Sequence, residues 1–184
     1  LNNVPQLDLS NATNISFMFA YCSNLTTIPS IDIPRVWNMG SAFAYCNKVT
    51  VIHPIDTSKV NIISNLLNAC PSLTTVEGID FSGLTSSPNY LFGFNPNNVV
   101  LTHLIVNGKI NVSIYDNNSI KALNAIDYDS VKSILEAANR TDNTDAKTLA
   151  FNRTIADQNG ELASLVSSCT NKGWTINGLT LLAN

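Results

Sequence analysis

Cysteines and aspartates recur at a fixed interval in the first half of the chain, and both residue types can bind metal ions. The interval is 24 residues, and the members are Cys22, Cys46, Cys70, Asp8, Asp32, Asp56 and Asp80. Thiolates hold zinc or join as disulfides, whereas carboxylates hold calcium. Because both residue types keep one interval, a structural repeat must position them, and the repeat decides which chemistry is open to them.

The cysteine column is best explained as part of a hydrophobic core. Neighbouring strands in a stack lie about 4.8 Å apart, and side chains in such a column point in parallel. A disulfide needs side chains that point toward each other, and columns of Phe, Leu and Ile surround the cysteines. We therefore predict buried free thiols, with a metal site or a disulfide as the alternative. Cys169 lies on the apolar side of a helical pattern and has the same prediction.

The aspartate column is predicted to cap turns. Asp-x-Ser occurs three times, beginning at Asp8, Asp56 and Asp80. An aspartate in this position accepts a hydrogen bond from a backbone N–H two or three residues later. A calcium-binding ladder is the alternative, but no glycine-rich calcium consensus accompanies the aspartates. If the four carboxylates lie in one column, mutual repulsion should raise some of their pKa values.

The residues after each cysteine predict a short strand with one side toward the core. The stretch from Leu25 to Ile28 recurs at residues 49–52, 73–76 and 101–104, rich in Thr and β-branched residues. With Leu25 and Ile28 inside, the alternate residues point outward and share one open face. These outward residues are Thr27, Val51, His53, Thr75, Glu77, His103 and Ile105.

Two histidines and a glutamate on this face have the side chains for catalysis or metal binding. His53, Glu77 and His103 would lie on adjacent strands. No nucleophile elbow, zinc-binding pair or glycine-rich phosphate loop accompanies them. We therefore expect no catalytic residue, no metal and no cofactor. The face is interpreted as a ligand-contact surface, because repeat proteins bind through extended concave surfaces.

Trp37 is a further candidate for ligand contact. Its equivalents in the neighbouring copies are Thr13 and Asn61, which are polar. Such a position is expected to be exposed, and an exposed tryptophan is a common binding hot spot, although packing against a neighbouring loop is the alternative. The predicted ligand-contact residues are therefore Thr27, Trp37, Val51, His53, Thr75, Glu77 and His103.

The repeat is visible in further motifs. Phe19-Ala20-Tyr21-Cys22 recurs at residues 43–46 and, more loosely, at 67–70, and a degraded fourth copy is expected at 91–98. The Phe-x-x-Cys segment predicts a helical turn or an irregular return. One copy has too few apolar residues to bury a face alone, so neighbouring copies should stack into a continuous core.

From about residue 119 the 24-residue pattern gives way to helical spacing. Helices are predicted over 131–138 and 162–169, and strands over 148–151 and 174–176. Asp127 or Asp129 should cap the first helix, and Lys172-Gly173 should end the second. The predicted organisation is therefore an α/β repeat domain over 1–118 and a helix–strand capping segment over 119–184.

Composition narrows the classes of partner. The formal net charge is -3 and only 12% of residues are charged, which gives no basic patch for nucleic acid. No apolar run is long enough to span a bilayer, so no membrane insertion is expected. Asn, Ser and Thr make up about a third of the chain, which favours a secreted or surface-displayed protein. The start at Leu1, without a leader sequence, is interpreted as that of a mature or excised fragment.

The repeat resembles the BspA type of leucine-rich repeat, whose pattern runs Asp-x-Ser-x-Val-x-x-Met-x-x-Met-Phe-x-x-Cys-x-x-Leu-x-x-Ile. The first copy matches at Asp8, Ser10, Met18, Phe19, Cys22, Leu25 and Ile28, and the third over residues 56–76. Pro34 and Leu67 depart from the pattern, and the copy after Phe81 matches only in part. The resemblance covers about residues 4–106. It implies a leucine-rich-repeat-like right-handed solenoid of about four 24-residue repeats with a helix–strand C-terminal cap.

The resemblance also implies a role in recognition. Such repeats occur on surface proteins of gut and oral bacteria, in some protozoa and in phage tail proteins. We therefore expect a non-enzymatic recognition or adhesion module, extracellular or on a bacterial cell surface, that binds a protein or a glycan. The alternative is a receptor-binding or structural component of a phage tail or baseplate, located in the virion. The identity of the ligand and the oligomeric state stay open.

Overall fold

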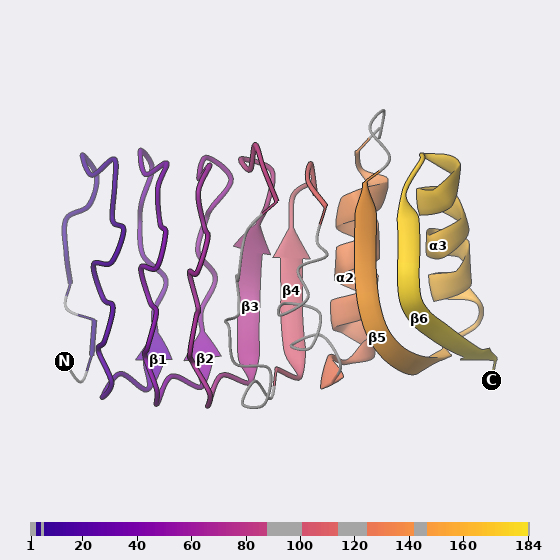
Figure 1. Ribbon diagram of the computed structural model, residues 1–184, viewed down its shortest axis with the longest axis horizontal. Coiled ribbons are helices and arrows are strands. Elements are labelled where there is room, and N and C mark those ends of the chain that lie inside the picture. The colour runs from indigo at the N-terminus through magenta and orange to yellow at the C-terminus, as the bar shows by residue number, and fades with distance from the viewer. Residues whose placement is uncertain (1–2, 5, 88–100, 114–124, 142–146, 184) are drawn as a thin grey trace.

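The protein is an α/β fold with two parallel sheets and two helices, in a computed structural model that describes residues 3–4, 6–87, 101–113, 125–141 and 147–183. Its elements are β1 (Thr27–Ile28), β2 (Val51–Ile52), β3 (Thr75–Asp80), β4 (His103–Asn107), α2 (Tyr128–Asn139), β5 (Thr148–Asp157), α3 (Glu161–Asn171) and β6 (Thr175–Ala183) (Figure 1). The expected fourth copy at 91–98 and the expected domain boundary at 118 lie outside the described residues.

Strands β1 to β4 form one parallel sheet, and its pairing follows the interval of the sequence. Thr27 pairs with Val51, and Val51 with Thr75, each 24 residues on. β3 pairs with β4 in the same direction, and the strands lie side by side along the long axis of the molecule (Figure 1). Leu25 and Ile28 are buried on the inner side, as the apolar pattern predicts.

Residues 14–21 and their equivalents form a second ladder, on the side from which the chain returns (the return side). Asn14 bridges to Asn38, and Asn38 to Ile62, in parallel. The chain here passes through overlapping turns without helix, so the irregular return is the correct interpretation of the Phe-x-x-Cys segment. Left-handed φ values between 56° and 62° occur at Phe17, Tyr21, Ser41, Tyr45, Asn65 and Ala69.

Every second backbone N–H of the return side points to the following copy. The donors are Ile15, Phe17, Phe19 and Tyr21, and the acceptors are the carbonyls of Asn38, Gly40, Ala42 and Ala44, at 2.8–3.1 Å. Residues 39–45 bond to residues 62–68 in the same way. Intervening N–H groups close turns, as from Ala42 to the Met39 carbonyl at 3.0 Å. The return side thus satisfies its backbone groups without a regular strand.

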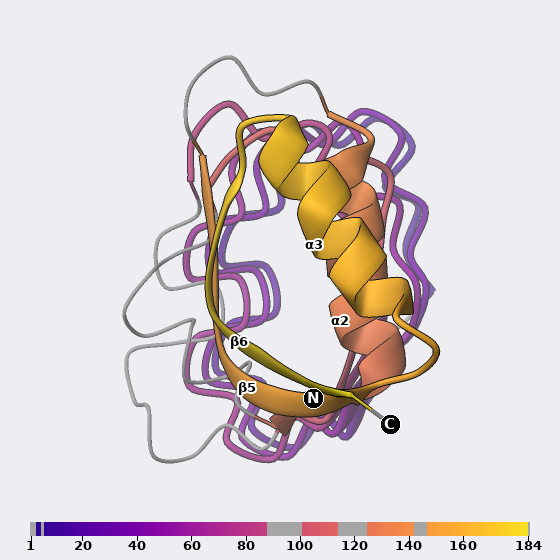
Figure 2. The same ribbon diagram turned by 90° about the vertical axis from the view of Figure 1, so that its right-hand side faces the viewer.

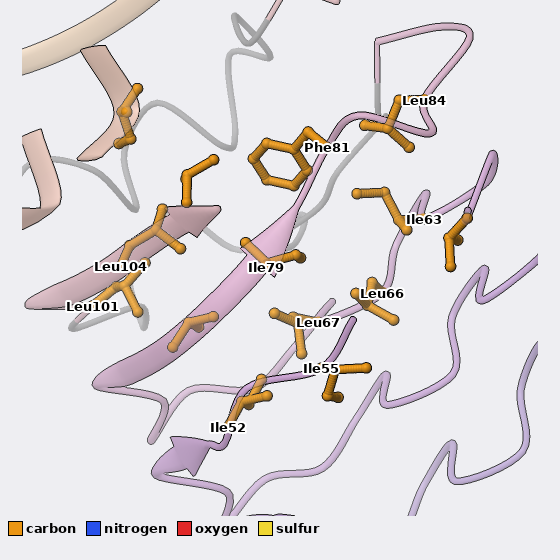
Figure 3. Packing of buried hydrophobic residues seen from close by; sticks show 14 of the residues in the cluster. Ile52, Ile55, Ile63, Leu66, Leu67, Ile79, Phe81, Leu84, Leu101 and Leu104 are labelled. Atoms are coloured by element: carbon orange, nitrogen blue, oxygen red, sulfur yellow. The ribbon is translucent and has the colours of Figure 1, made fainter. Parts of the chain in front are cut away.

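Apolar side chains from the two sides fill the space between them. Figure 3 shows Ile52 from the strand side near Leu66 and Leu67 from the return side. The ring of Phe19 stacks on that of Phe43, with centroids 5.4 Å apart and planes 4° from parallel. Each fully buried Leu or Ile contributes about 1.5–3 kcal/mol. This core fixes the register of both ladders.

Helix α2 covers the free edge of β4. Ser130 Oγ accepts the N–H of Leu104 at 2.7 Å, and Ser133 Oγ accepts the N–H of Val106 at 3.2 Å. Ser133 Oγ also donates to the Leu104 carbonyl at 3.2 Å. Unpaired backbone N–H and C=O groups on an open sheet edge would attract further strands. Helix α2 therefore takes the place of a fifth strand.

Strands β5 and β6 pair separately, on the side opposite α2 and α3 (Figure 2). Thr148 pairs with Thr175, and Asp157 with Ala183. The strand predicted at 148–151 is confirmed and continues to Asp157. The second strand begins at Thr175 instead of Trp174, whose side chain is buried.

At the start of each helix a carboxylate accepts hydrogen bonds from backbone N–H groups. Asp127 is the N-cap of α2, as one of the two predicted candidates, and accepts the N–H of Ser130 at 2.9 Å. Asp157, at the end of β5, accepts the N–H of Leu162 in the first turn of α3 at 2.8 Å. Gly173 follows α3 with a φ of 86°, which is the glycine helix end that the sequence predicts.

Candidate functional site

The structure brings together six of the seven predicted ligand-contact residues on the outer side of β1 to β4 (the strand face). The paired row across the sheet consists of Thr27, Val51, Thr75 and His103. His53 and Glu77 follow two residues after Val51 and Thr75. All six are exposed or half-buried, so their side chains are available to a ligand.

Both histidines of the strand face are oriented by a carboxylate from the following copy or helix. His53 Nδ1 lies 2.8 Å from Glu77 Oε2, and His103 Nδ1 lies 2.7 Å from Asp127 Oδ2. Partial burial acts to raise the pKa of Asp127, but hydrogen bonds from Ser130 and His103 outweigh it and lower that pKa. The Nε2 atoms bond to no residue that the structure describes.

An imidazole held by a carboxylate can serve in a metal site or as a general base. Within the described residues, no group of three or more His, Cys, Asp or Glu side chains is placed to hold a metal ion. His53 and His103 each have one carboxylate neighbour. The strand face thus offers hydrogen-bonding groups at fixed positions, which suits recognition of a ligand.

Trp37 lies on the return side, apart from the other six predicted residues. Its backbone N–H donates to the Thr13 carbonyl at 3.0 Å, and its backbone carbonyl accepts the N–H of Asn61 at 2.8 Å. The side chain is 44% exposed. Its predicted exposure is confirmed, but it does not share a surface with the strand face.

Turn capping is confirmed for three of the four aspartates. Asp8, Asp56 and Asp80 each accept the backbone N–H two residues later, at 3.0, 3.0 and 2.7 Å. For Asp32 the prediction is wrong, because Pro34 stands two residues later and has no N–H. The column is therefore a series of local turns.

The expected rise in pKa from carboxylate repulsion is also wrong for two members of the column. Hydrogen bonds from the side chain and backbone of Ser10 lower the pKa of Asp8, and those of Ser58 lower the pKa of Asp56. Hydrogen bonds to the charged form stabilise it. Local hydrogen bonds with Ser10 and Ser58 thus set the direction of the pKa at Asp8 and Asp56.

The cysteines are free thiols, as predicted, and three of them are buried. Cys46 Sγ donates to the Phe19 carbonyl at 3.3 Å, and Cys70 makes the equivalent bond one copy later. Burial raises the pKa to about 11 for Cys46, about 12 for Cys70 and about 11 for Cys169. Cys22, in the first copy, is half-buried, contrary to the prediction.

Exposed aromatic residues gather on the return side, and the sequence-based prediction missed all of them except Trp37. Phe17 is exposed, and Tyr21 stacks on Tyr45 with ring centroids 4.6 Å apart and planes 4° from parallel. The Phe-Ala-Tyr-Cys motif marks the repeat but does not indicate this exposure. Strict alternation would place Tyr21 on the same side as Phe19, two residues earlier, which is buried.

A hollow of about 380 Å³ lies at the start of α3. Its lining residues are Asp157, Asn159, Gly160, Ala163, Leu181 and Ala183. The first free N–H groups of α3 point to Asp157, which accepts from Leu162 and Ala163 at 2.8 and 3.0 Å. Because a carboxylate already occupies the helix N-terminus, the hollow is unsuited to an anion.

Comparisons with protein-family models, curated proteins and solved structures find no match to this chain. Among the described residues, no helix is long and apolar enough to cross a bilayer. The strand face and the return side are therefore the surfaces that bear on function.

Proposed function

We propose that the chain is a right-handed leucine-rich-repeat-like solenoid of the BspA type, and that it serves as a non-enzymatic recognition or adhesion module of a bacterial cell-surface or secreted protein. The ligand is a protein or a glycan that contacts the strand face. The solenoid is supported by parallel pairing on both sides of the chain, from Thr27 to Val51 and from Asn14 to Asn38, at one interval.

One observation carries the functional proposal: the polar side chains of the strand face are fixed before any ligand arrives. His53, directly after β2, and His103, at the start of β4, are each held by a carboxylate, at 2.8 and 2.7 Å, and both strands belong to one hydrogen-bonded sheet. Groups held in position lose little conformational entropy on binding, which favours affinity and specificity. The side chains of the strand face can form hydrogen bonds and van der Waals contacts with a ligand, as a recognition surface requires.

Binding of the purified chain to immobilised extracellular-matrix proteins and mucin glycoproteins tests the proposal. Thr75→Arg places a bulky charge in the centre of the strand face and should weaken binding at least about tenfold. Ser164→Ala, an exposed substitution in α3, is the matched control and should bind as the unmodified chain does. Binding to no member of the panel, or equal binding by Thr75→Arg, would contradict the proposal.

A phage tail or baseplate component is the second candidate, because β6 pairs only with β5 among the described strands. An edge strand can pair with a strand of a partner, and Leu182 of β6 is 53% exposed. Such a component should assemble. Light scattering that gives the monomer mass of 19.9 kDa at high concentration would count against this candidate.

A further inference from the structure

The stacked tyrosines of the return side form a surface that is distinct from the strand face. Tyr21 is 69% exposed and Tyr45 is 40% exposed, although their rings cover each other at 4.6 Å. The Phe19–Phe43 stack, two residues earlier in each copy, is buried and has the same near-parallel arrangement, with its planes 4° apart. The rings of both pairs thus lie face to face.

Tyrosine is not required at these positions by the fold. Tyr21 and Tyr45 have left-handed φ values of 62°, which cost an ordinary residue about 1–2 kcal/mol. Ala69 takes the same conformation at the equivalent position, with a φ of 56°. Neither phenol hydroxyl bonds to any residue that the structure describes. The backbone conformation therefore belongs to the turn and does not require an aromatic ring, and the exposed phenols are left free to contact a ligand.

One face of Tyr45 has no ring of a described residue against it. Tyr21 covers the face toward the first copy, whereas the next position along the column is Ala69, which has only a methyl group. Among the described residues, the stacked aromatic pairs are Phe19–Phe43 and Tyr21–Tyr45. A flat ring-shaped group can therefore continue the stack beyond Tyr45.

The return side that carries this stack has no charged side chain of its own. Residues 14–21, 38–45 and 62–69 contain no Asp, Glu, Lys or Arg, and their polar side chains are Asn and Ser together with the two tyrosines. Lys48, three residues after Tyr45, donates from its Nζ to Asn24 Oδ1 at 3.1 Å. Amides and hydroxyls exchange hydrogen bonds with neutral hydroxyl groups and give no preference for an ionic ligand.

We propose that the Tyr21–Tyr45 stack is a binding site for a neutral glycan, with a pyranose ring seated on the free face of Tyr45. The C–H bonds on the apolar side of the sugar lie against the electron-rich face of the phenol ring. The phenol hydroxyls and neighbouring amides bond to the sugar hydroxyls. A protein partner is the less favoured occupant, because protein hot spots centre on desolvated pockets, and this surface is a projecting stack.

Titration with soluble neutral hexasaccharides (cellohexaose, laminarihexaose, mannohexaose and chitohexaose) tests the site, with a hyaluronan hexasaccharide as the charged comparison. At least one neutral oligosaccharide should bind with a Kd below about 10 mM and give saturation-transfer NMR signals from its ring protons. Tyr45→Asn should weaken this binding about tenfold or more. Asparagine tolerates the left-handed backbone, so this variant should keep the melting temperature.

Two further variants separate the site from a general loss of structure and from the strand face. Tyr45→Phe keeps the ring and should bind within about threefold of the unmodified chain, because stacking supplies most of the contact. His53→Ala alters only the strand face and should leave glycan binding unchanged. The proposal is overturned by binding of none of the neutral hexasaccharides, by unchanged binding in Tyr45→Asn, or by tighter binding of the charged one. It does not depend on the strand-face ligand, whose own test uses Thr75→Arg.

Discussion

Replacement of Ser130 by alanine removes the hydroxyl that joins helix α2 to the edge of β4. Ser130 is fully buried and accepts the N–H of Leu104, itself 2% exposed, at 2.7 Å. In Ser130→Ala this N–H is left without an acceptor, which costs about 1–3 kcal/mol. Alanine returns about 0.5 kcal/mol through its higher helix propensity. The expected net loss in the free energy of unfolding is about 0.5–2.5 kcal/mol.

Urea denaturation followed by circular dichroism measures this loss, with Ser164→Ala as the matched control. Ser164 is exposed in α3, so its replacement should change the free energy of unfolding by no more than about 0.5 kcal/mol. In thermal unfolding, Ser130→Ala should melt lower by about 2–4 °C for each kcal/mol. The amide hydrogen of Leu104 should exchange faster, by a factor that corresponds to about the same free energy. Equal stability of the two variants would refute the assignment of Ser130 as the acceptor that closes this edge.

Four further predictions follow from the contacts described above. Gly83→Ala should lower stability by about 1–3 kcal/mol in urea denaturation, because a Cβ there would lie 2.6 Å from the Ser58 carbonyl oxygen and 2.7 Å from that of Val60; an unchanged midpoint would contradict this close approach. Cys22→Ser should abolish native thiol labelling at pH 8, since burial keeps the remaining thiols protonated, and labelling before denaturation would disprove their burial. Asp127→Asn should destabilise the chain most at neutral pH: the lowered folded pKa of Asp127 adds stability above its unfolded value of about 3.9, and this stability is lost as pH falls through the folded pKa. The difference in stability between variant and unmodified chain should thus shrink below about pH 4, and a constant difference would argue against the hydrogen bonds that stabilise the Asp127 carboxylate. Millimolar calcium should leave the melting temperature unchanged, because the aspartate column caps turns; a rise would favour the calcium ladder instead.

The elements of the fold were largely predictable because they depend on local spacing. The apolar interval from Leu25 to Ile28 located the strands, and helical spacing from residue 131 located α2. The replacement of a fifth strand by α2 was not predictable in this way. Periodicity tells which side of an element is buried, but not which neighbour buries it, and the role of Ser130 depends on that neighbour.

The candidate surfaces were predictable only in part, for a similar reason. Alternation along the strand placed His53 and Glu77 outward, and the structure adds that they bond to each other. Asp127 was expected as a helix cap, but its bond to His103 joins residues 24 apart that belong to different patterns. The tyrosine stack requires knowledge that Tyr21 and Tyr45 are exposed, and the motif they share with a buried phenylalanine concealed it.

The hydrogen bonds of the return side give that side of the molecule a dipole along the stack. Each linked peptide unit, such as that between Asn38 and Met39, accepts at its carbonyl from the preceding copy and donates its N–H to the following one. Peptide dipoles aligned in this way add along the axis of the stack, as they do along a helix. The edge at residues 14–21 carries the negative pole and the opposite end the positive pole. Two such carbonyl edges repel each other, so copies of this surface cannot join head to head through their backbones.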